Sequence, residues 1–182
     1  MTPFEQLLDG FLYRPDEPGL PGLQWLDEAP RPSEASAEAP HEYLAFALTD
    51  ETYAVPIERV REIVKVPPLT EVPRAPKELL GVINLRGEVL PVYDVRARLL
   101  LRPKVEPIWG PDDVPAKSRI LLVRSEAGDA GILADAVEGV VRLLPSLTES
   151  APPGGTEQPY LAGLSRRGDR LYILLDVERV LD

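Results

Sequence analysis

The sequence predicts an all-β fold built from two similar halves. Its apolar residues fall mainly in short alternating runs bounded by turn residues, and few runs have the period and length of a helix. The stretch GVINLRGEVLPVYDVRARL at 81–99 is matched by GLSRRGDRLYILLDVERVL at 163–181. Each reads as a glycine-led strand, a turn with Gly, an apolar strand, an Asp-Val pair and a short amphipathic segment. This duplication indicates two small β-barrels packed on one another.

Composition and charge exclude several classes of function. The chain of 182 residues can bury a stable core, and it has no cysteine for disulfide or thiolate chemistry. Its net charge is −10, and residues 1–40 hold eight acidic but only two basic residues. This balance argues against binding to nucleic acid or to an anionic membrane surface. With no basic leader and no run of about 20 apolar residues, we expect a cytoplasmic protein without direct membrane insertion.

Residues 1–40 predict an acidic, Pro-rich and disordered extension. The segment 3–13 is amphipathic, with one apolar helical face made of Phe4, Leu7, Leu8, Phe11 and Leu12. Residues 1–14 could pack on the body of the chain or insert into a groove of a further partner. The stretch from Pro15 to Pro40 is too poor in apolar residues to offset its ordering entropy.

The folded domain is expected over residues 41–182. The stretch EYLAFAL at 42–48 predicts a half-buried strand, and TYAVP at 52–56 predicts its return. The segment 57–64 has helical spacing and predicts a short helix that ends before Pro67. The second half repeats this order, with strands on both sides of a turn at 126–129, and with loops at 103–117 and 152–155. Whether each half forms its own barrel or lends strands to the other stays open.

Within the repeated unit, fold and function make different demands. We expect Gly87 to supply a positive φ in the turn, and Gly81 to allow either a close approach of backbone or a bend at the strand start. A β-turn does not demand arginine, so we predict that Arg86 pairs with Glu62 and orients a surface for partners. The apolar strand residues are expected in the core: Val89, Val92, Tyr93, Leu171, Ile173 and Leu175.

The sequence offers little catalytic chemistry. It has no P-loop, no zinc motif and a single histidine, His41, which lacks companions for a metal or catalytic site. Asp94 and Asp176 each precede a short amphipathic run, where Asp is a preferred N-cap, and we favour capping over acid–base work. The prediction is a protein that is not an enzyme and has no catalytic residues, cofactor or metal.

The order of motifs resembles one family. YLAFALTDETYAVPIERVREIV, GVINLRGEVLPVYDVRARL and YLAGLSRRGDRLYILLDVERVL together closely resemble CheW, the coupling protein of bacterial chemotaxis. The domain also occurs as the regulatory domain of the histidine kinase CheA. The resemblance covers residues 42–182 and implies two packed, five-stranded SH3-like β-barrels with short helices.

The resemblance also implies a role. CheW-like proteins are non-enzymatic scaffolds that couple the cytoplasmic tips of chemoreceptors to the regulatory domain of a CheA-type histidine kinase, in arrays at the membrane. Carried over by motif, the residues that it implies for partner binding are Val60, Glu62, Ile63, Gly81, Asn84, Leu85, Arg86 and Gly87.

Other interpretations stay open at this point. A CheW-like adaptor could serve a non-flagellar array for gliding, pili or surface behaviour, and recruit a dedicated partner through residues 1–40. A small-molecule-binding β-barrel or an enzyme would need a deep polar pocket. A nucleic-acid-binding barrel is disfavoured by the charge balance and by the lack of a basic aromatic stripe.

Overall fold

Strands dominate the structure, a computed structural model that describes residues 38–101, 110–150 and 159–182. Residues 38–182 form one compact unit, which contains all of the described strands and helices. The predicted amphipathic segment 3–13, the extension up to residue 37 and much of the loops at 103–117 and 152–155 lie outside the described residues.

Each half of the unit contributes strands in the same order. The first half, residues 41–101, contains β1 (His41–Leu48), β2 (Glu51–Pro56), β3 (Val60–Lys65), β4 (Leu79–Leu85) and β5 (Glu88–Tyr93). The second half, residues 119–182, contains β6 (Arg119–Ser125), β7 (Gly128–Ala134), β8 (Ala136–Leu143), β9 (Thr148–Ser150), β10 (Leu161–Arg167) and β11 (Arg170–Leu175). The short helices are η2 (Ile57–Arg59), η3 (Pro111–Asp113), η4 (Pro145–Leu147) and α2 (Val177–Leu181).

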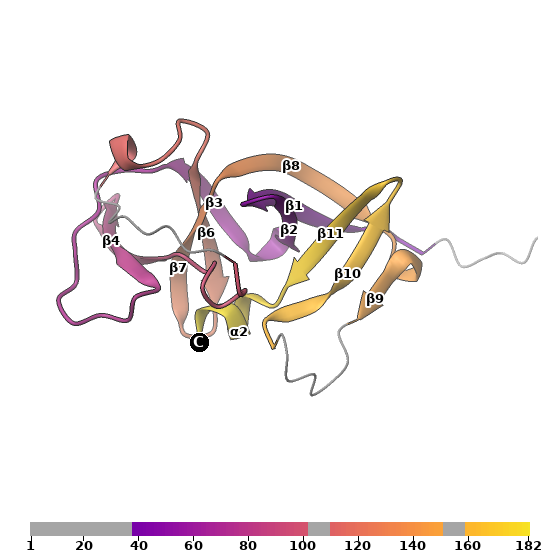
Figure 1. Ribbon diagram of the computed structural model, residues 1–182. Helices are drawn as coiled ribbons and strands as arrows, with labels where there is room; N and C mark the ends of the chain where they lie inside the picture. The colour runs from indigo at the N-terminus through magenta and orange to yellow at the C-terminus, as the bar shows by residue number, and fades with distance from the viewer. Residues whose placement is uncertain (1–37, 102–109, 151–158) are drawn as a thin grey trace, which may run out of the picture. The chain divides into compact units, whose positions relative to one another are not determined.

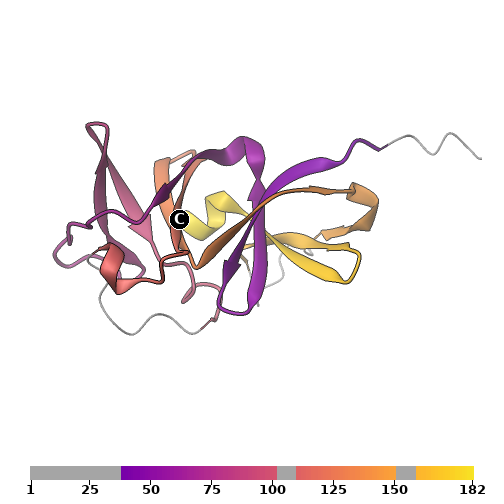
Figure 2. The ribbon, with the colours of Figure 1, turned by 90° about the horizontal axis from the view of Figure 1, so that it is seen from above.

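The two halves exchange strands. The six-stranded sheet has the order β8-β1-β2-β11-β10-β9, and the five-stranded sheet has the order β3-β6-β7-β5-β4. Each sheet therefore takes its first hairpin from one half and its other strands from the other half. Figures 1 and 2 show the sheets side by side, with the chain crossing between them from β2 to β3 and from β7 to β8.

The exchange is symmetric in its pairing. The β3–β6 and β1–β8 pairs are both antiparallel, whereas the β5–β7 and β2–β11 pairs are both parallel. Gly81 and Gly163 lead β4 and β10 past a close backbone neighbour, because an added Cβ would lie 2.6 Å from the Thr70 oxygen and 2.5 Å from the Glu149 oxygen. The expected close approach at Gly81 is thus confirmed, and its counterpart has the same cause.

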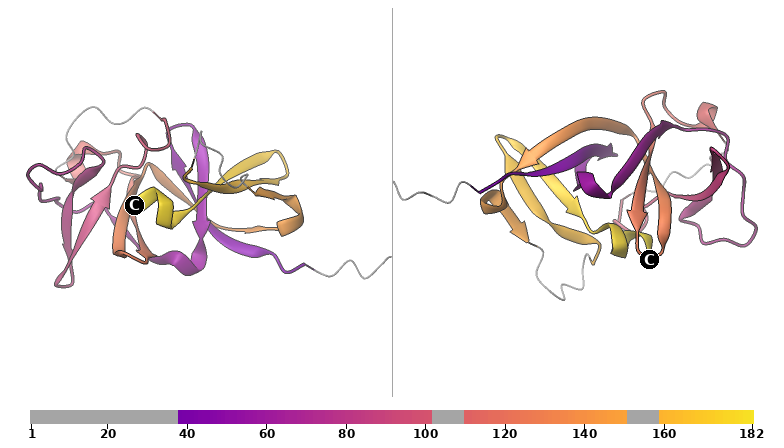
Figure 3. Two further views of the ribbon diagram at one scale, coloured as in Figure 1. Left: turned by 90° about the horizontal axis from the view of Figure 1, so that it is seen from below. Right: turned by 180° about the vertical axis from the view of Figure 1, so that it is seen from behind.

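The apolar core has a central part between the sheets and a separate part within each sheet. The central cluster combines β1 and β2 with β6 and β7, through residues such as Phe46 and Leu121. It also includes Val177 and Val180 of α2, which lies between the sheets near the C-terminus (Figures 1 and 3). Burial on this scale is the main stabilising contribution, at about 25 cal/mol per Å² of apolar surface.

Three sequence expectations about local structure are wrong. The segment 57–64 forms only the short η2 before β3, because the rest of it is an extended strand that pairs with β6. Ile57, Val60 and Val64 pack against the core, whereas Ile63 is exposed. The strand at 42–48 is buried on both faces in its centre, since Leu44, Ala45 and Phe46 are all buried. Val89 and Leu171 are exposed by 64% and 47%, because each lies at the turn end of its strand, before the first buried residue of β5 or β11.

The two Asp-Val pairs have different outcomes. The Asp176 carboxylate accepts hydrogen bonds from the Glu178 and Arg179 backbone N–H groups, so it caps α2 as predicted. Asp94 is buried and is followed by turns instead of a helix. Its carboxylate accepts bonds from the backbone N–H and the side chain of Arg96, which is itself only 1% exposed.

Candidate partner-binding surface

The β4–β5 turn holds two residues in the left-handed region. Arg86 has φ 54° and Gly87 has φ 89°, which is the pattern of a two-residue type I′ hairpin. The Asn84 Oδ1 atom accepts a hydrogen bond from the Gly87 N–H at 2.9 Å and so closes the turn. The positive φ predicted at Gly87 is confirmed, and Asn84 acquires a structural role in the same turn.

The predicted pairing of Arg86 with Glu62 is confirmed. The Arg86 Nη2 atom lies 2.8 Å from Glu62 Oε1, and the arginine side chain is 74% exposed. Glu62 is on β3 and Arg86 follows β4, which are the two end strands of the five-stranded sheet. An exposed pair contributes at most about 1 kcal/mol to stability, so its main effect is to orient the guanidinium.

A second ion-pair group lies at the same end of the sheet. Arg61 lies 2.6 Å from Glu88 at the start of β5 and 2.6 Å from Asp129 on β7. The hydrogen bond from Arg61 holds the pKa of Glu88 below its usual value of 4.5. Together with the Arg86–Glu62 pair, these contacts join β3 to the β4–β5 hairpin through side chains.

Several residues implied for partner binding pack against the body of the protein. Gly81 is buried against the Thr70 backbone, which exchanges two hydrogen bonds with Val82. Val60 and Leu85 are half-buried, with Val60 against the central core and Leu85 against the core of the five-stranded sheet. Val60 and Leu85 thus connect β3 and β4 to the core.

The exposed part of the surface combines polar and apolar side chains. Ile63 on β3 is 40% exposed, and Asn84, Arg86 and Gly87 are exposed at the turn. Val89 lies opposite Asn84 in the β4–β5 register and is also exposed, although its apolar pattern predicted a core position. The signal that could have identified it was its place next to the turn, where a strand leaves the core.

The matching hairpin of the second half has a different surface. Its turn is Gly168-Asp169, with φ 60° at Gly168; Leu171 is exposed near the turn, and Leu164 is exposed farther along β10. Arg166 and Arg167 are exposed on β10. Arg170 lies 2.8 Å from Glu138 on β8, at the place where the first half has Glu88 and Arg61.

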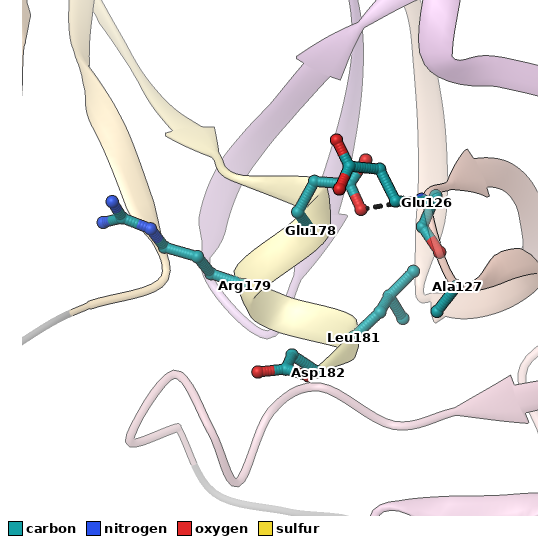
Figure 4. A pocket seen from close by; sticks show the side chains of 7 residues that line it. Glu126, Ala127, Glu178, Arg179, Leu181 and Asp182 are labelled. Carbon is teal, nitrogen blue, oxygen red and sulfur yellow. Dashed lines mark hydrogen bonds between the residues drawn. The ribbon is translucent and has the colours of Figure 1, made fainter.

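Other kinds of site have less support in the described residues. Residues 38–101, 110–150 and 159–182 contain no group of three His, Cys, Asp or Glu side chains placed to hold a metal. In the same residues, no helix is long and apolar enough to cross a membrane. A surface pocket of about 330 Å³ beside α2 is lined by Ser125, Glu126, Ala127, Glu178, Arg179, Leu181 and Asp182 (Figure 4).

Known proteins are similar to this chain in sequence and in fold. The family model of the CheW-like domain matches residues 42–182. The chemotaxis protein CheW of Helicobacter pylori is 31% identical, with 83% of this chain and 92% of that protein covered. The probable chemotaxis protein CheW of Rhizobium etli is 32% identical over 75% of this chain and 84% of that protein. Protein FrzA of Myxococcus xanthus is 35% identical over 66% of this chain and 70% of that protein.

A solved structure agrees with these relatives. The scaffolding protein TtCheW from Thermoanaerobacter tengcongensis superimposes with a TM-score of 0.69 and 28% sequence identity, covering 79% of this chain and 93% of that chain. The sequence resemblance, the all-β fold and the family match over most of the chain therefore lead to one conclusion. The chain belongs to the CheW-like domain family, the adaptor and scaffold proteins of chemotaxis signalling.

Proposed function

We propose that this protein couples chemoreceptors to a CheA-type histidine kinase as a non-enzymatic scaffold at membrane-associated receptor arrays. In this proposal the receptor tip lies against the exposed end of the five-stranded sheet, with Arg86 at its centre. Ile63, Asn84 and Val89 are the further exposed side chains of this surface. The tip of a chemoreceptor is a helical hairpin, and exposed apolar residues beside an oriented cation fit a helix that carries both apolar and acidic side chains.

One observation carries the proposal. Arg86 occupies a left-handed position, at φ 54°, where the equivalent turn of the second half has Gly168 at φ 60°. A left-handed conformation costs a non-glycine residue about 1–2 kcal/mol. The Glu62 pair, being exposed, does not offset more than part of this cost. A side chain kept at a conformational cost on the surface supports a role in recognition, as strained residues cluster at functional sites.

For the kinase, we assign the exposed apolar side chains of the second half. Leu164 and Leu171 are 37% and 47% exposed on the neighbouring strands β10 and β11. They lie on a different sheet from Arg86, so one scaffold could hold both partners at once. The receptor and kinase contacts are then separable by mutation.

Co-purification with a receptor tip and with a kinase regulatory domain tests both assignments. Arg86→Glu should weaken receptor binding by about tenfold or more and leave kinase binding within about twofold. Leu171→Glu should have the opposite pattern. The double variant Glu62→Arg with Arg86→Glu should recover part of the receptor binding lost in either single variant. If the wild-type protein associates with neither partner, the coupling role is wrong.

A second candidate is an adaptor of a non-flagellar array for gliding, pili or surface behaviour. The family match begins at residue 42, so the acidic residues 1–40 lie outside the matched domain and are available for a dedicated partner, with residues 1–14 as its ligand. Deletion of residues 1–37 separates the two candidates. Loss of localisation or of a bound protein, with receptor and kinase binding retained, would favour the second.

A further inference from the structure

The exchange of strands poses a problem of specificity. Each sheet combines the first hairpin of one half with the other strands of the other half, and the two halves are similar. The first hairpin of one chain could therefore join the strands of the same half in a second copy of the chain. We call this like-half pairing: first half with first half, and second half with second half. The charged contacts between the two halves bear directly on this alternative.

The first contact is a buried junction around Arg96. Its Nη2 atom lies 2.7 Å from Asp135 Oδ1, and its Nη1 atom lies 2.7 Å from Asp94 Oδ1. Arg96 belongs to the first half, whereas Asp135 lies at the β7–β8 crossing of the second half. The other Asp135 oxygen accepts a hydrogen bond from the Thr49 backbone N–H in the β1–β2 turn, at 2.8 Å.

The second contact has the same plan with the charges reversed. Glu178 follows Asp176 by two residues, as Arg96 follows Asp94. It pairs with Arg59 at the β2–β3 crossing, and its Oε2 atom accepts a hydrogen bond from the Glu126 backbone N–H in the β6–β7 turn (Figure 4). At both junctions a carboxylate accepts a hydrogen bond from a backbone N–H of a hairpin turn. At the first junction this carboxylate is Asp135 at the β7–β8 crossing, and at the second junction it is Glu178 of α2.

The third contact lies in the bulges of β3 and β8. Arg61 and Glu138 occupy equivalent positions, because both are skipped in the pairing with the neighbouring hairpin. Arg61 faces Asp129 of the other half at 2.6 Å, while Glu138 faces Thr52, whose hydroxyl lies 3.4 Å away. Charge is therefore reversed at this position as well.

We propose that these reversed charges specify the pairing of unlike halves and oppose like-half pairing. In a like-half pairing of second halves, Glu178 would meet Asp135 of the other copy, and Glu138 would meet Asp129. In the pairing of first halves, Arg96 would meet Arg59. Like charges in close contact are unfavourable, most of all where water is excluded, as at the buried Arg96 site.

Two neighbouring charges do not change this result. Glu58 precedes Arg59, but it lies beside Tyr43, where burial and the Glu58 carboxylate together raise the pKa of the phenol. Glu58 lines a surface pocket together with His41, Glu42 and Tyr43 at the start of β1. The Arg142–Glu42 pair also joins the halves, at 2.8 Å. This pair favours neither unlike-half nor like-half pairing. Lys65 on β3 has the register position of Arg142, so in a like-half pairing it would meet Glu42 instead.

The test uses the full chain with a reporter of like-half pairing. Glu42 is opposite Arg142 and Lys65 is opposite Arg119, so residues 42 and 65 face each other only in like-half pairing. The chain has no cysteine, and Glu42→Cys with Lys65→Cys would then form an intermolecular disulfide. An ordinary domain swap between unlike halves keeps the native pairs and gives no such bond.

The pair of reporter cysteines is introduced into three proteins: the wild type, a junction swap and a control swap. Each protein is unfolded in denaturant, refolded at high protein concentration and oxidised. The junction swap, Arg59→Glu with Glu178→Arg, keeps opposite charges within one chain but makes each half complementary to itself. The control swap, Glu62→Arg with Arg86→Glu, reverses a pair inside the first half. We expect a several-fold larger fraction of covalent dimer from the junction swap than from the wild type or the control swap. Equal fractions in all three would overturn the proposal.

A second variant keeps the test decisive if the junction swap does not refold. Glu178→Gln removes one of the two opposed carboxylates of the second half and leaves Arg59 with an amide partner. Its dimer fraction should still exceed that of the wild type. A refolded Glu178→Gln protein that yields only monomer without crosslinks would contradict the inference.

Discussion

The two β-hairpins of the duplicated unit have the same strands and different turns. The first turn is Arg86-Gly87, with both residues at positive φ, whereas the second is Gly168-Asp169, with only the glycine there. The second turn is conformationally easy, because glycine enters the left-handed region without a steric cost. The first turn keeps arginine at that place and orients it through Glu62. The difference separates what the fold needs from what we assign to partner recognition.

The same contrast holds at the two junctions between the halves. Arg96 is buried and contacts two aspartates, whereas the Arg59 and Glu178 side chains are 41% and 31% exposed. The duplicated unit thus has a closed junction, where Arg96 is buried, and an open junction, where Arg59 and Glu178 are partly exposed. Substitutions at equivalent positions should therefore have unequal effects.

The largest expected effect is at the closed junction. Arg96→Met leaves Asp94 and Asp135 without their buried cation, which typically costs about 3–5 kcal/mol of unfolding free energy. Glu178→Gln at the open junction should cost less than about 1 kcal/mol, since water screens that pair. Denaturant unfolding of the two variants measures the difference. Equal losses would refute the contrast between the junctions.

An effect of intermediate size is expected at the glycines that lead β4 and β10. Gly81→Ala and Gly163→Ala would each place a Cβ within 2.6 Å of a backbone oxygen, which cannot move aside without shifting a strand. Each should cost about 2 kcal/mol or more, in the range of strong local strain. Thermal unfolding measures both. Both glycines meet the same constraint of the fold. A large loss of stability in one variant and none in the other would show that the two halves are not equivalent at this position.

The smallest expected effect is a dependence on pH at the first hairpin. Arg61 lowers the pKa of Glu88, so this carboxylate stabilises the fold above its usual value of 4.5, and the contribution is lost as pH falls through the lower folded-state pKa. Glu88→Gln should therefore lose less stability than the wild type between about pH 5 and pH 3. Identical pH profiles would show that the pair is not formed in solution.

Sequence reasoning reached the duplication, the positive φ at Gly87 and the Arg86–Glu62 pair, because turn chemistry and isolated charges in apolar motifs are local signals. It missed the exposure of Val89 and Leu171, since an alternating strand does not reveal which apolar residues extend beyond the core. It also left the strand exchange open. An apolar pattern shows which face of a strand is buried, but strands of like pattern can pair with either half.

The reversed charges at the junctions were equally out of reach of the sequence. Arg96 and Glu178 are visible at matching places after the two Asp-Val pairs, but their partners, Asp135 and Arg59, are distant in the chain. Only the crossing of the strands brings these pairs together. The helical spacing of residues 57–64 misled for a related reason, because the pairing of β3 with β6 overrides a local period.

The most direct measurement is the affinity of a receptor tip for Arg86→Gly, determined together with the stability of the variant. Glycine relieves the left-handed strain, so the unfolding free energy should stay level or rise by up to about 1 kcal/mol. Receptor binding should nevertheless fall by about tenfold or more, because the oriented guanidinium is gone. Unchanged receptor binding by a stable Arg86→Gly protein would contradict the assignment of this turn to partner recognition.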